Sequence, residues 1–324
     1  MKVYLGVDVG SVTTKIAGLN ENDELVTHTY LPTQGKPIEM TQLGLKQIKQ
    51  QLPEDVNICG VATTGSARYL AGVIVGADLV KNEITSHAVA TLQYTPQVQT
   101  IIEIGGQDSK IIIIRDGIIT DFGMNTVCAA GTGSFLDHQA ARLDMSIEEF
   151  SQRALDSSAP VRIAGRCTVF AESDMIHKQQ MGHRTEDIVY GLCQALVRNY
   201  LNNVGLGKNI KSPMVFQGGV AFNRGIVKAL QEELDAEIIV PPHHEVMGAI
   251  GAALLVHEET VNNSNGSKFK GFGISEVKYH TSSFECKACP NQCEIAQLSL
   301  NGQVLARWGG RCDRWERSPG SQES

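Results

Sequence analysis

Short apolar runs alternate along the chain with longer stretches whose apolar residues recur every three to four positions. The short runs are rich in β-branched residues and bounded by glycine, which predicts strands at Val3–Val9, Ile58–Ala62, Thr100–Ile104, Lys110–Ile114, Met214–Phe216 and Glu237–Val240. The longer stretches predict amphipathic helices at Glu39–Gln51, Gly133–Leu143, Glu186–Val204 and Val220–Leu234. Strands and helices in this alternation are typical of an α/β protein.

Two segments of the chain repeat one pattern. "YLGVDVGSVTTKIAGLNENDEL" and "IIEIGGQDSKIIIIRDGII" each consist of a strand, a glycine-rich turn with an aspartate, a second strand and a polar turn. Both indicate a hairpin whose tight turn carries a carboxylate. The repeat predicts two structurally similar lobes that face a cleft.

The character of the sequence changes after Leu255. "HEETVNNSNGSKFKG" is polar and aperiodic, as in a linker, and the segment beyond it is rich in cysteine. We therefore expect the two lobes to span residues 1–257, a linker 258–283 and a small separate module 284–324.

Composition narrows the class of protein. The 324 residues are 42% hydrophobic and 19% charged, as in an ordinary globular protein, and the formal net charge of −7 argues against binding to nucleic acid or to an anionic membrane. No apolar run approaches the ~20 residues of a membrane span, and the N-terminus does not read as a signal peptide. The expected location is cytoplasmic. Eight cysteines in a reducing compartment favour metal or redox chemistry over disulfides.

The first glycine-rich turn has the composition of a phosphate site. In "GVDVGSVTTKIAGL", Gly10 lets backbone N–H groups approach an anion. Asp8 is placed to hold Mg²⁺ through water, as the catalytic carboxylate. Further polar groups for the phosphates come from Ser11, Thr13, Thr14 and Lys15. Taken alone, the segment fits a plain glycine turn between strands equally well.

Two later segments complete a nucleotide pattern. "IGGQDSK" repeats the turn, with Asp108 as the second carboxylate for Mg²⁺ and with Gly105, Gly106, Gln107 and Lys110 around it. In "VFQGGVAFNRGI", Gly218 and Gly219 let the backbone lie against an adenine ring, and Asn223 can face the nucleoside. Together the three segments resemble the actin, Hsp70 and sugar-kinase superfamily. That resemblance implies a two-lobed ATPase with ribonuclease H-like duplicated domains that binds MgATP.

Two cysteine motifs resemble one group within that superfamily. "NTVCAAGTGSFLD" and "GRCTVFAESDMI" are similar to motifs of the activators of 2-hydroxyacyl-CoA dehydratases, in the BadF/BadG/BcrA/BcrD ATPase family. The resemblance covers nearly all of Met1–His257. It implies a homodimer in which Cys128 and Cys167 of each subunit hold one shared [4Fe–4S] cluster. It also implies that ATP drives electrons from ferredoxin or flavodoxin to an iron–sulfur acceptor enzyme, a dehydratase or related reductase.

The residues after Cys128 suit such a cluster. A four-thiolate cluster is anionic, and a helix N-terminus presents unpaired N–H groups. Ala129, Ala130 and Gly131 would let these N–H groups reach the sulfur atoms, where hydrogen bonds tune the potential. The alternative for both cysteines is a pair of buried structural thiols. Cys59 and Cys193 are interpreted as packing residues.

Other positions match the family more loosely. Residues predicted by resemblance to lie between nucleotide and cluster are Thr64, Gly65, Arg68, Glu83 and His87. The alternative is a solvated loop followed by a helix N-terminus. Glu103 departs from the aspartate of many relatives before the second turn, which leaves Asp8 and Asp108 as the expected pair for Mg²⁺.

The C-terminal cysteines form a separate group. Cys286-x2-Cys289-x3-Cys293 with a distant Cys312 supplies four thiolates, which suits tetrahedral Zn²⁺ or a second iron–sulfur cluster. Similar segments follow the ATPase in large multidomain relatives of the family, so this module can be the start of a further domain.

Two other functions remain open from the sequence alone. One is a small-molecule kinase of the same superfamily, acting on a sugar or carboxylate, with structural cysteines. The other is a regulatory ATP-binding module whose C-terminal zinc mediates partner contacts.

Overall fold

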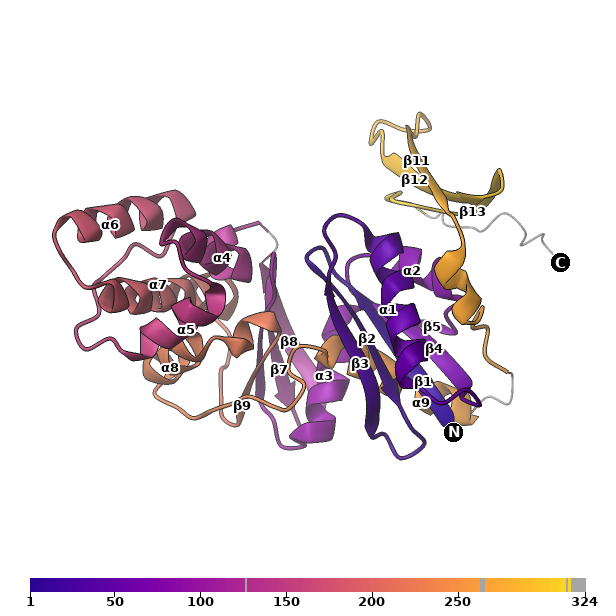
Figure 1. The fold of residues 1–324 in the computed structure, drawn as a ribbon, viewed down its shortest axis with the longest axis horizontal. Coiled ribbons are helices and arrows are strands. Elements are labelled where there is room, and N and C mark those ends of the chain that lie inside the picture. The colour runs from indigo at the N-terminus through magenta and orange to yellow at the C-terminus, as the bar shows by residue number, and fades with distance from the viewer. Residues whose placement is uncertain (126, 263–265, 313, 316–324) are drawn as a thin grey trace. The chain divides into compact units, whose positions relative to one another are not determined.

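The computed structural model describes residues 1–125, 127–262, 266–312 and 314–315 (Figure 1). The chain forms two compact units: the first unit comprises Met1–Ser86 and Gly248–Ser324, and the second His87–Met247. The division falls within helix α3 (Glu83–Tyr94) and at the first residue of α9 (Met247–Asn262). Among the described residues, none of the helices has the length and apolarity that crossing a membrane requires.

The first unit is built on a five-stranded sheet. Its strands follow the order β3-β2-β1-β4-β5. In that order they span Leu25–Pro32, Thr13–Leu19, Lys2–Val9, Asn57–Thr64 and Leu79–Val80. β1, β2 and β3 are antiparallel neighbours, whereas β4 and β5 run parallel to β1.

The second unit repeats this sheet. The order is β8-β7-β6-β9-β10, with β6, β7 and β8 as the antiparallel meander and β9 and β10 parallel to β6. In the order of the sheet, these strands span Ile118–Asn125, Ser109–Arg115, Thr100–Ile104, Met214–Gln217 and Ile238–Ile239. Each sheet therefore has the order 3-2-1-4-5 in its own numbering, which confirms the two similar α/β halves predicted from the repeated hairpin.

Helices of the first unit pack against its sheet. α1 (Pro37–Gln51) begins with a proline, which suits the first turn of a helix because the backbone N–H groups there have no carbonyl partner within the helix. The helix buries Thr41, Gly44, Leu45 and Ile48. α2 (Arg68–Val75) ends at the left-handed Gly76. α9 lies close to β1 because Gly6 has no Cβ to strike the carbonyl of Ala249.

Helices of the second unit surround α7 (Thr185–Tyr200), which is buried on most of its surface. α7 runs on into a π-helical turn, η2 (Leu201–Gly205), so the predicted helix 186–204 changes its winding near its end. The predicted helix 220–234 is also divided, because Asn223 caps α8 after the short helix η3. The remaining elements are η1 (Ala129–Gly131), α4 (Gly133–Arg142), α5 (Ile147–Leu155), α6 (Thr168–Gln180), η3 (Gly219–Phe222) and α8 (Arg224–Leu234).

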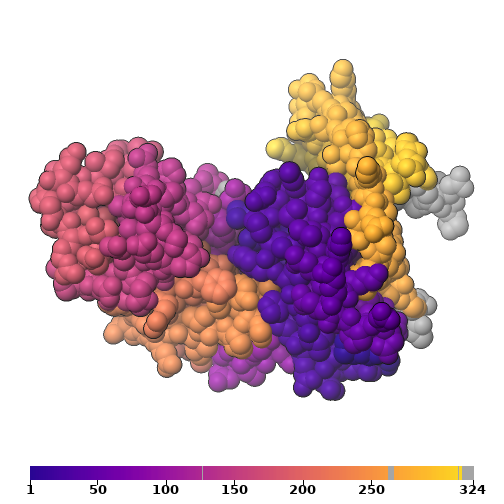
Figure 2. Space-filling view, in the orientation of Figure 1, coloured from indigo at the N-terminus to yellow at the C-terminus, as the bar shows by residue number. Residues whose placement is uncertain are grey.

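The C-terminal segment folds as a small antiparallel sheet that belongs to the first unit. Its strands are β11 (His280–Glu285), β12 (Glu294–Leu300) and β13 (Gln303–Trp308), preceded by the short helix η4 (Phe272–Glu276). Ile274 and Leu298 join the apolar core of the first unit, and Figure 2 shows this orange-to-yellow segment against the indigo part. α9 reaches Asn262 and β11 starts at His280, so ordered elements enter the stretch 258–283 that the sequence assigns to a linker.

Candidate functional site

The glycine turn of the first unit joins β1 to β2. The N–H of Gly10 donates to the carbonyl of Thr13 at 2.9 Å and closes the turn. Asp8 and Lys15 are paired neighbours on the two strands, and Lys15 Nζ lies 3.0 Å from Asp8 Oδ2. Asp8 is 4% exposed, so a buried carboxylate paired with Lys15 stands at the base of this turn. Ser11 is exposed beside it.

Thr14 lies differently from its neighbours. Its side chain is fully buried, and its hydroxyl is 2.9 Å from that of Thr33. Strand alternation places it on the face opposite Thr13 and Lys15. This placement speaks against the predicted contact between Thr14 and a phosphate.

The second unit builds the same turn between β6 and β7. The N–H of Gly105 donates to the carbonyl of Asp108 at 3.0 Å. Lys110 is 2% exposed, and its Nζ lies 2.9 Å from Glu103 Oε2 and 2.9 Å from Asp108 Oδ2. Gly106 is half-buried and Gln107 exposed.

Comparing the two turns adds Glu103 to the predicted carboxylates, Asp8 and Asp108. Asp8 and Glu103 each stand two residues before the glycine that closes the turn, and each is paired in register with a lysine, Lys15 or Lys110. Glu103 is thus the counterpart of Asp8, whereas Asp108 occupies the position of Thr13. The sequence analysis did not give Glu103 this role; the lysine seven positions after each carboxylate was the signal that could have found it.

The diglycine turn follows β9 in the second unit. Gly218 has φ of 93°, and a Cβ there would lie 2.6 Å from the carbonyl oxygen of Ile104, so only glycine fits. Gly219 begins η3. Asn223 Oδ1 caps α8 by accepting from the N–H of Ile226, but its buried Nδ2 has no hydrogen-bond partner among the described residues.

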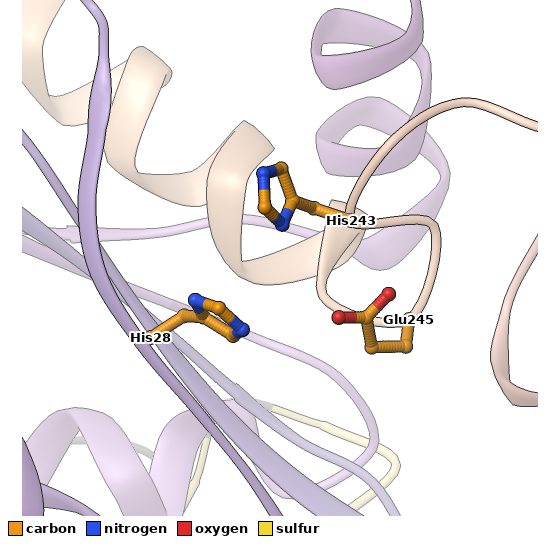
Figure 3. A group of neighbouring side chains, drawn as sticks. All are labelled: His28, His243 and Glu245. Atoms are coloured by element: carbon orange, nitrogen blue, oxygen red, sulfur yellow. The ribbon is translucent and has the colours of Figure 1, made fainter.

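The loop between β10 and α9 supports this turn. The N–H of Gly218 donates to the carbonyl of His244 at 2.9 Å, and the His244 ring packs edge-on against Phe222 with centroids 4.3 Å apart. His243 and Glu245 flank His244 on the same loop, and Figure 3 labels both together with His28 of β3 in the first unit. The sequence analysis did not predict a role for this loop.

The loosely matched positions lie in defined surroundings. A Cβ on Gly65 would stand 2.5 Å from Asp8 Oδ1, so this glycine lets the β4–α2 turn reach the carboxylate. Arg68 Nη1 donates to the Gly65 carbonyl at 3.1 Å, and Thr64 is buried with its hydroxyl 3.2 Å from that of Ser86.

α3 carries the other two loosely matched residues. Glu83 begins the helix and is half-buried. His87 is buried, and its Nδ1 lies 2.9 Å from Nε2 of Gln217, the residue before the diglycine turn.

Cys128 follows β8 in a tight turn held by Asn125. Asn125 Oδ1 accepts from the N–H of Cys128 at 2.9 Å, and Asn125 Nδ2 donates to the Cys128 carbonyl at 2.8 Å. The thiol is half-buried. η1 follows directly, with Ala129 exposed and with Ala130 and Gly131 buried.

Cys167 stands at the N-cap of α6 and is also half-buried. Asn199 of α7 connects its segment to that of Cys128. The Cys128 Sγ lies 3.7 Å from both Oδ1 and Nδ2 of Asn199, while Asn199 Nδ2 donates to the carbonyl of Gly165. The structure thus brings the two cysteine segments to one side chain that the sequence analysis did not identify.

The turn at Gly105 is tied to the cysteine segment by hydrogen bonds. The first N–H groups of α4, at Gly133 and Ser134, donate to the carbonyls of Gly105 and Gly106 at 2.8 Å each, and Ser134 Oγ donates to Gly106 at 2.5 Å. A Cβ on Gly133 would lie 3.1 Å from the Gly105 oxygen, so the small residue permits the approach. These two N–H groups of α4 therefore serve the turn rather than a cluster.

The remaining cysteines fall into two groups, the predicted packing residues and the C-terminal cysteines. Cys193 is fully buried in α7, where burial raises the pKa of its thiol, and Cys59 is half-buried on β4, which agrees with packing roles. Of the C-terminal cysteines, Cys286 and Cys293 lie at the same end of the small sheet, where the N–H of Cys286 donates to the carbonyl of Cys293. Among the described residues, however, no three of the C-terminal Sγ atoms lie within 4.8 Å of one another.

Two duplicated α/β units with matched carboxylate–lysine turns and a diglycine turn define an ATPase of the actin and sugar-kinase-like fold. The profile of the BadF/BadG/BcrA/BcrD ATPase family matches residues 5–256. The chain belongs to this family.

Similar proteins of known activity support this assignment. The chain is 34% identical over 267 residues to the (R)-2-hydroxyglutaryl-CoA dehydratase activating ATPase of Acidaminococcus fermentans, covering 80% of this chain and 99% of that protein. It is 33% identical to the 2-hydroxyisocaproyl-CoA dehydratase activator of Clostridioides difficile, covering 79% and 95%.

Solved structures of two relatives share the fold. Component A of the Acidaminococcus fermentans dehydratase superimposes with a TM-score of 0.75 at 31% identity, over 81% of this chain and 100% of that one. The activator from Clostridium difficile, solved with bound ADPNP, gives 0.73 at 32% identity, over 81% and 97%.

Proposed function

We propose that this ATPase uses MgATP to drive low-potential electrons into a partner iron–sulfur enzyme. The residues of each unit fit the nucleotide. Gly10 and Gly105 close turns without side chains in the way of an anion, Gly218 leaves a surface that a Cβ would fill, and the buried Asn223 Nδ2 is a donor in need of an acceptor. A related activator was solved with an ATP analogue.

The carboxylates of the turns suit Mg²⁺, which takes oxygen ligands and retains waters. Asp8 in the first unit, and Asp108 with Glu103 in the second, are each held by a lysine at 2.9–3.0 Å. We infer that the lysines orient these carboxylates, and that Lys15 and Lys110 offset the negative charge of the phosphates.

Cys128 and Cys167 are the proposed ligands of a [4Fe–4S] cluster, which when bound would supply one-electron chemistry. Two thiolates per chain complete such a cluster only with a second copy, so the proposal includes a homodimer with twofold symmetry. Exposed apolar side chains next to both cysteines support it: Val127 is 93% exposed, Val169 67% and Phe170 66%.

One observation carries the proposal: the Gly105–Asp108 turn and the segment after Cys128 share three hydrogen bonds, through Gly133 and Ser134. A second link comes from α7, where Asn199 contacts Cys128 and the next residue, Tyr200, donates to the Lys110 carbonyl at 2.8 Å. Hydrolysis or release of the nucleotide phosphates at this turn would therefore alter the position of the residues around Cys128. ATP and ADP can shift such an equilibrium only through contacts that differ between two states, and the γ-phosphate supplies that difference.

The proposed electron donor is ferredoxin or flavodoxin. A cavity of about 1130 Å³ beside the Cys167 segment is lined by Arg162, Arg166, Lys178 and Arg198, which would attract an acidic carrier despite the net charge of −7. The proposed acceptor is an enzyme of the 2-hydroxyacyl-CoA dehydratase type, because relatives at 34% and 33% identity activate such enzymes.

The proposal is tested on protein purified without oxygen. We expect about two irons and two sulfides per chain at this site, and reduction of a purified 2-hydroxyacyl-CoA dehydratase component that requires ATP hydrolysis. Cys128→Ser should abolish both. Cys59→Ser is the matched control, since this thiol is half-buried on β4 of the first unit, whereas both cysteine segments belong to the second unit.

An active protein without iron at this site, or electron transfer that proceeds equally with ADP, would contradict the proposal. Phosphorylation of a sugar or carboxylate by iron-free protein would instead favour the small-molecule kinase.

A further inference from the structure

The C-terminal sheet brings cysteines that are separate in sequence to one of its ends. β11 and β12 are antiparallel, and their last paired residues are Glu285 and Glu294. Cys286 and Cys293 are the next residue on each side, and the N–H of Cys286 donates to the carbonyl of Cys293 at 2.8 Å. Cys289 lies in the short loop that these two residues enclose.

The chain after β13 returns to the same end. β13 pairs antiparallel with β12, with Trp308 opposite Ala296, so the residues that follow run past Glu294. Gly309 has φ of 99°, and a Cβ there would lie 2.7 Å from the Glu294 carbonyl oxygen. Only glycine permits this path. It leads to Cys312, three residues further on.

Contacts of Trp315 hold this returning segment in place. Its ring packs edge-on against Phe284 with centroids 5.0 Å apart. Its indole N–H donates to Cys286 Sγ at 3.1 Å. This bond holds the returning segment against the sulfur of Cys286 at the end of the sheet.

We propose that Cys286, Cys289, Cys293 and Cys312 form a four-thiolate metal site that closes the end of the small sheet. Cys286 and Cys293 adjoin the paired ends of β11 and β12, whereas Cys289 and Cys312 are exposed on loops. Their sulfur atoms are more widely spread than the about 3.8 Å expected between thiolates of a tetrahedral zinc site with bonds of about 2.3 Å. Metal binding would draw the two loop thiols inward, as expected where binding and folding are coupled.

The small sheet has too small an apolar core to be stable alone, so a metal site there would contribute to its stability. The buried apolar residues of the small sheet are Ile295, Leu298 and Ala306, too few for a core that stands alone. Leu298 already packs on the first unit. A metal would add a crosslink between the Cys286–Cys293 loop and the segment after β13, which these few apolar residues do not supply.

The test uses the full chain and compares metal content between variants. Cys289→Ser and Cys312→Ser change exposed thiols, so their folding should survive the change. Zinc, iron and sulfide per chain are measured in these variants, in the wild type, in Cys59→Ser as a matched control, and in Cys128→Ser/Cys167→Ser, which removes the cluster proposed for the second unit. Cobalt(II) added to metal-depleted protein reports thiolate ligands through its charge-transfer absorption.

We expect the Cys128→Ser/Cys167→Ser protein to retain metal, and either C-terminal variant to lose it together with the cobalt–thiolate band. One zinc without sulfide identifies a zinc site, and iron with equal sulfide identifies a cluster; both support the proposal. Absence of metal from the Cys128→Ser/Cys167→Ser protein after anaerobic reconstitution with each metal would overturn it. Metal that persists in Cys289→Ser and Cys312→Ser would overturn it as well.

Discussion

Asn199 contacts both cysteine-bearing segments of the second unit. Its amide lies 3.7 Å from Cys128 Sγ, donates to the Gly165 carbonyl and is buried at 4% exposure. Asn203 donates to its Oδ1 at 2.8 Å from one turn further along. Asn199 is therefore a positioning residue for the proposed cluster: it sets where the Cys128 thiol lies relative to the Cys167 loop.

We expect Asn199→Ala to destabilise the protein by about 1–3 kcal/mol, because it leaves the Gly165 carbonyl without this donor. The variant should also lose iron faster to a chelator while still binding ATP, since Asn199 lies outside the turns. Urea unfolding, iron release and nucleotide titration measure the three effects. Asn203→Ala is the control, because Asn203 is exposed and, among the described residues, its side chain donates only to Asn199 Oδ1. Equal iron release from both variants would remove Asn199 from this role.

Lys110 is the most deeply buried charge of the second turn. We expect Lys110→Met to destabilise the protein by about 3–5 kcal/mol, because Glu103 stays buried without its cation. Adding Glu103→Gln to that variant should restore part of the loss. Lys208→Met is the comparison, since its partner Asp121 is 49% exposed and solvent screens the pair, which should contribute less than about 1 kcal/mol. Urea unfolding at neutral pH measures all four proteins. A loss for Lys110→Met as small as for Lys208→Met would show that Glu103 tolerates the missing partner.

The local motifs of the candidate site could be predicted from the sequence, but the long-range side-chain contacts that connect them could not. Glycine turns and cysteines before helices are local patterns, and the structure brings Gly105, Asp108 and Lys110 together as expected. Asn199 is 71 positions from Cys128 and sits in a helix that reads as a packing element. A contact of that separation depends on how α7 crosses the sheet, which periodicity does not encode.

At the element scale, the N-terminus of α4 joins the two halves of the proposed mechanism. Its first N–H groups are satisfied by the carbonyls of Gly105 and Gly106 rather than by side-chain caps. Because these bonds join the turn to the start of α4, we expect displacement of the turn to shift α4 and, through η1, the backbone beside Cys128.

Ser134→Ala removes one of the three bonds between α4 and the turn. In the wild type, we expect the rate at which a chelator takes iron to differ between ADP and an ATP analogue. The variant should reduce that nucleotide effect by roughly fivefold, equivalent to about 1 kcal/mol. Ser173→Ala is the control, because the Ser173 hydroxyl in α6 donates to the Val169 carbonyl within its own helix, away from the turn. An unchanged nucleotide effect in Ser134→Ala would show that this bond carries no coupling.

Helices and strands could be predicted from the sequence where burial gives them a clear pattern of apolar residues. β1, β6 and β7 are apolar runs inside sheets, and their sequences mark them clearly. β8 is an edge strand with mostly exposed residues, so it lacks both the run and the alternation that indicate a strand. α9 continues to Asn262 with a polar last turn, which the sequence presents as the start of a linker.

At the scale of the whole molecule, the chain combines a duplicated fold with a proposed cluster site to which one chain contributes two of four ligands. Each unit supplies one carboxylate–lysine turn, so the duplication provides the two turns within one chain. The thiolates are different, because Cys128 and Cys167 provide two ligands where a cube of four irons takes four. The proposed function therefore makes assembly of two chains a requirement for activity.

The surface around these thiolates should then be the dimer interface. Phe170 is 66% exposed and lies three residues after Cys167 on α6, a helix of which Ala171 and Met175 are the buried residues. Phe170→Asp places a charge on this apolar surface, where two symmetric copies would bring like charges together. We expect the variant to be monomeric by light scattering and to lose the iron of this site.

Phe222→Asp is the matched control: Phe222 is 60% exposed on η3, a different element, and its substitution should leave the dimer intact. A Phe170→Asp protein that stays dimeric with full iron would exclude this face from the interface. A monomeric wild type that carries the whole cluster would overturn the shared site itself.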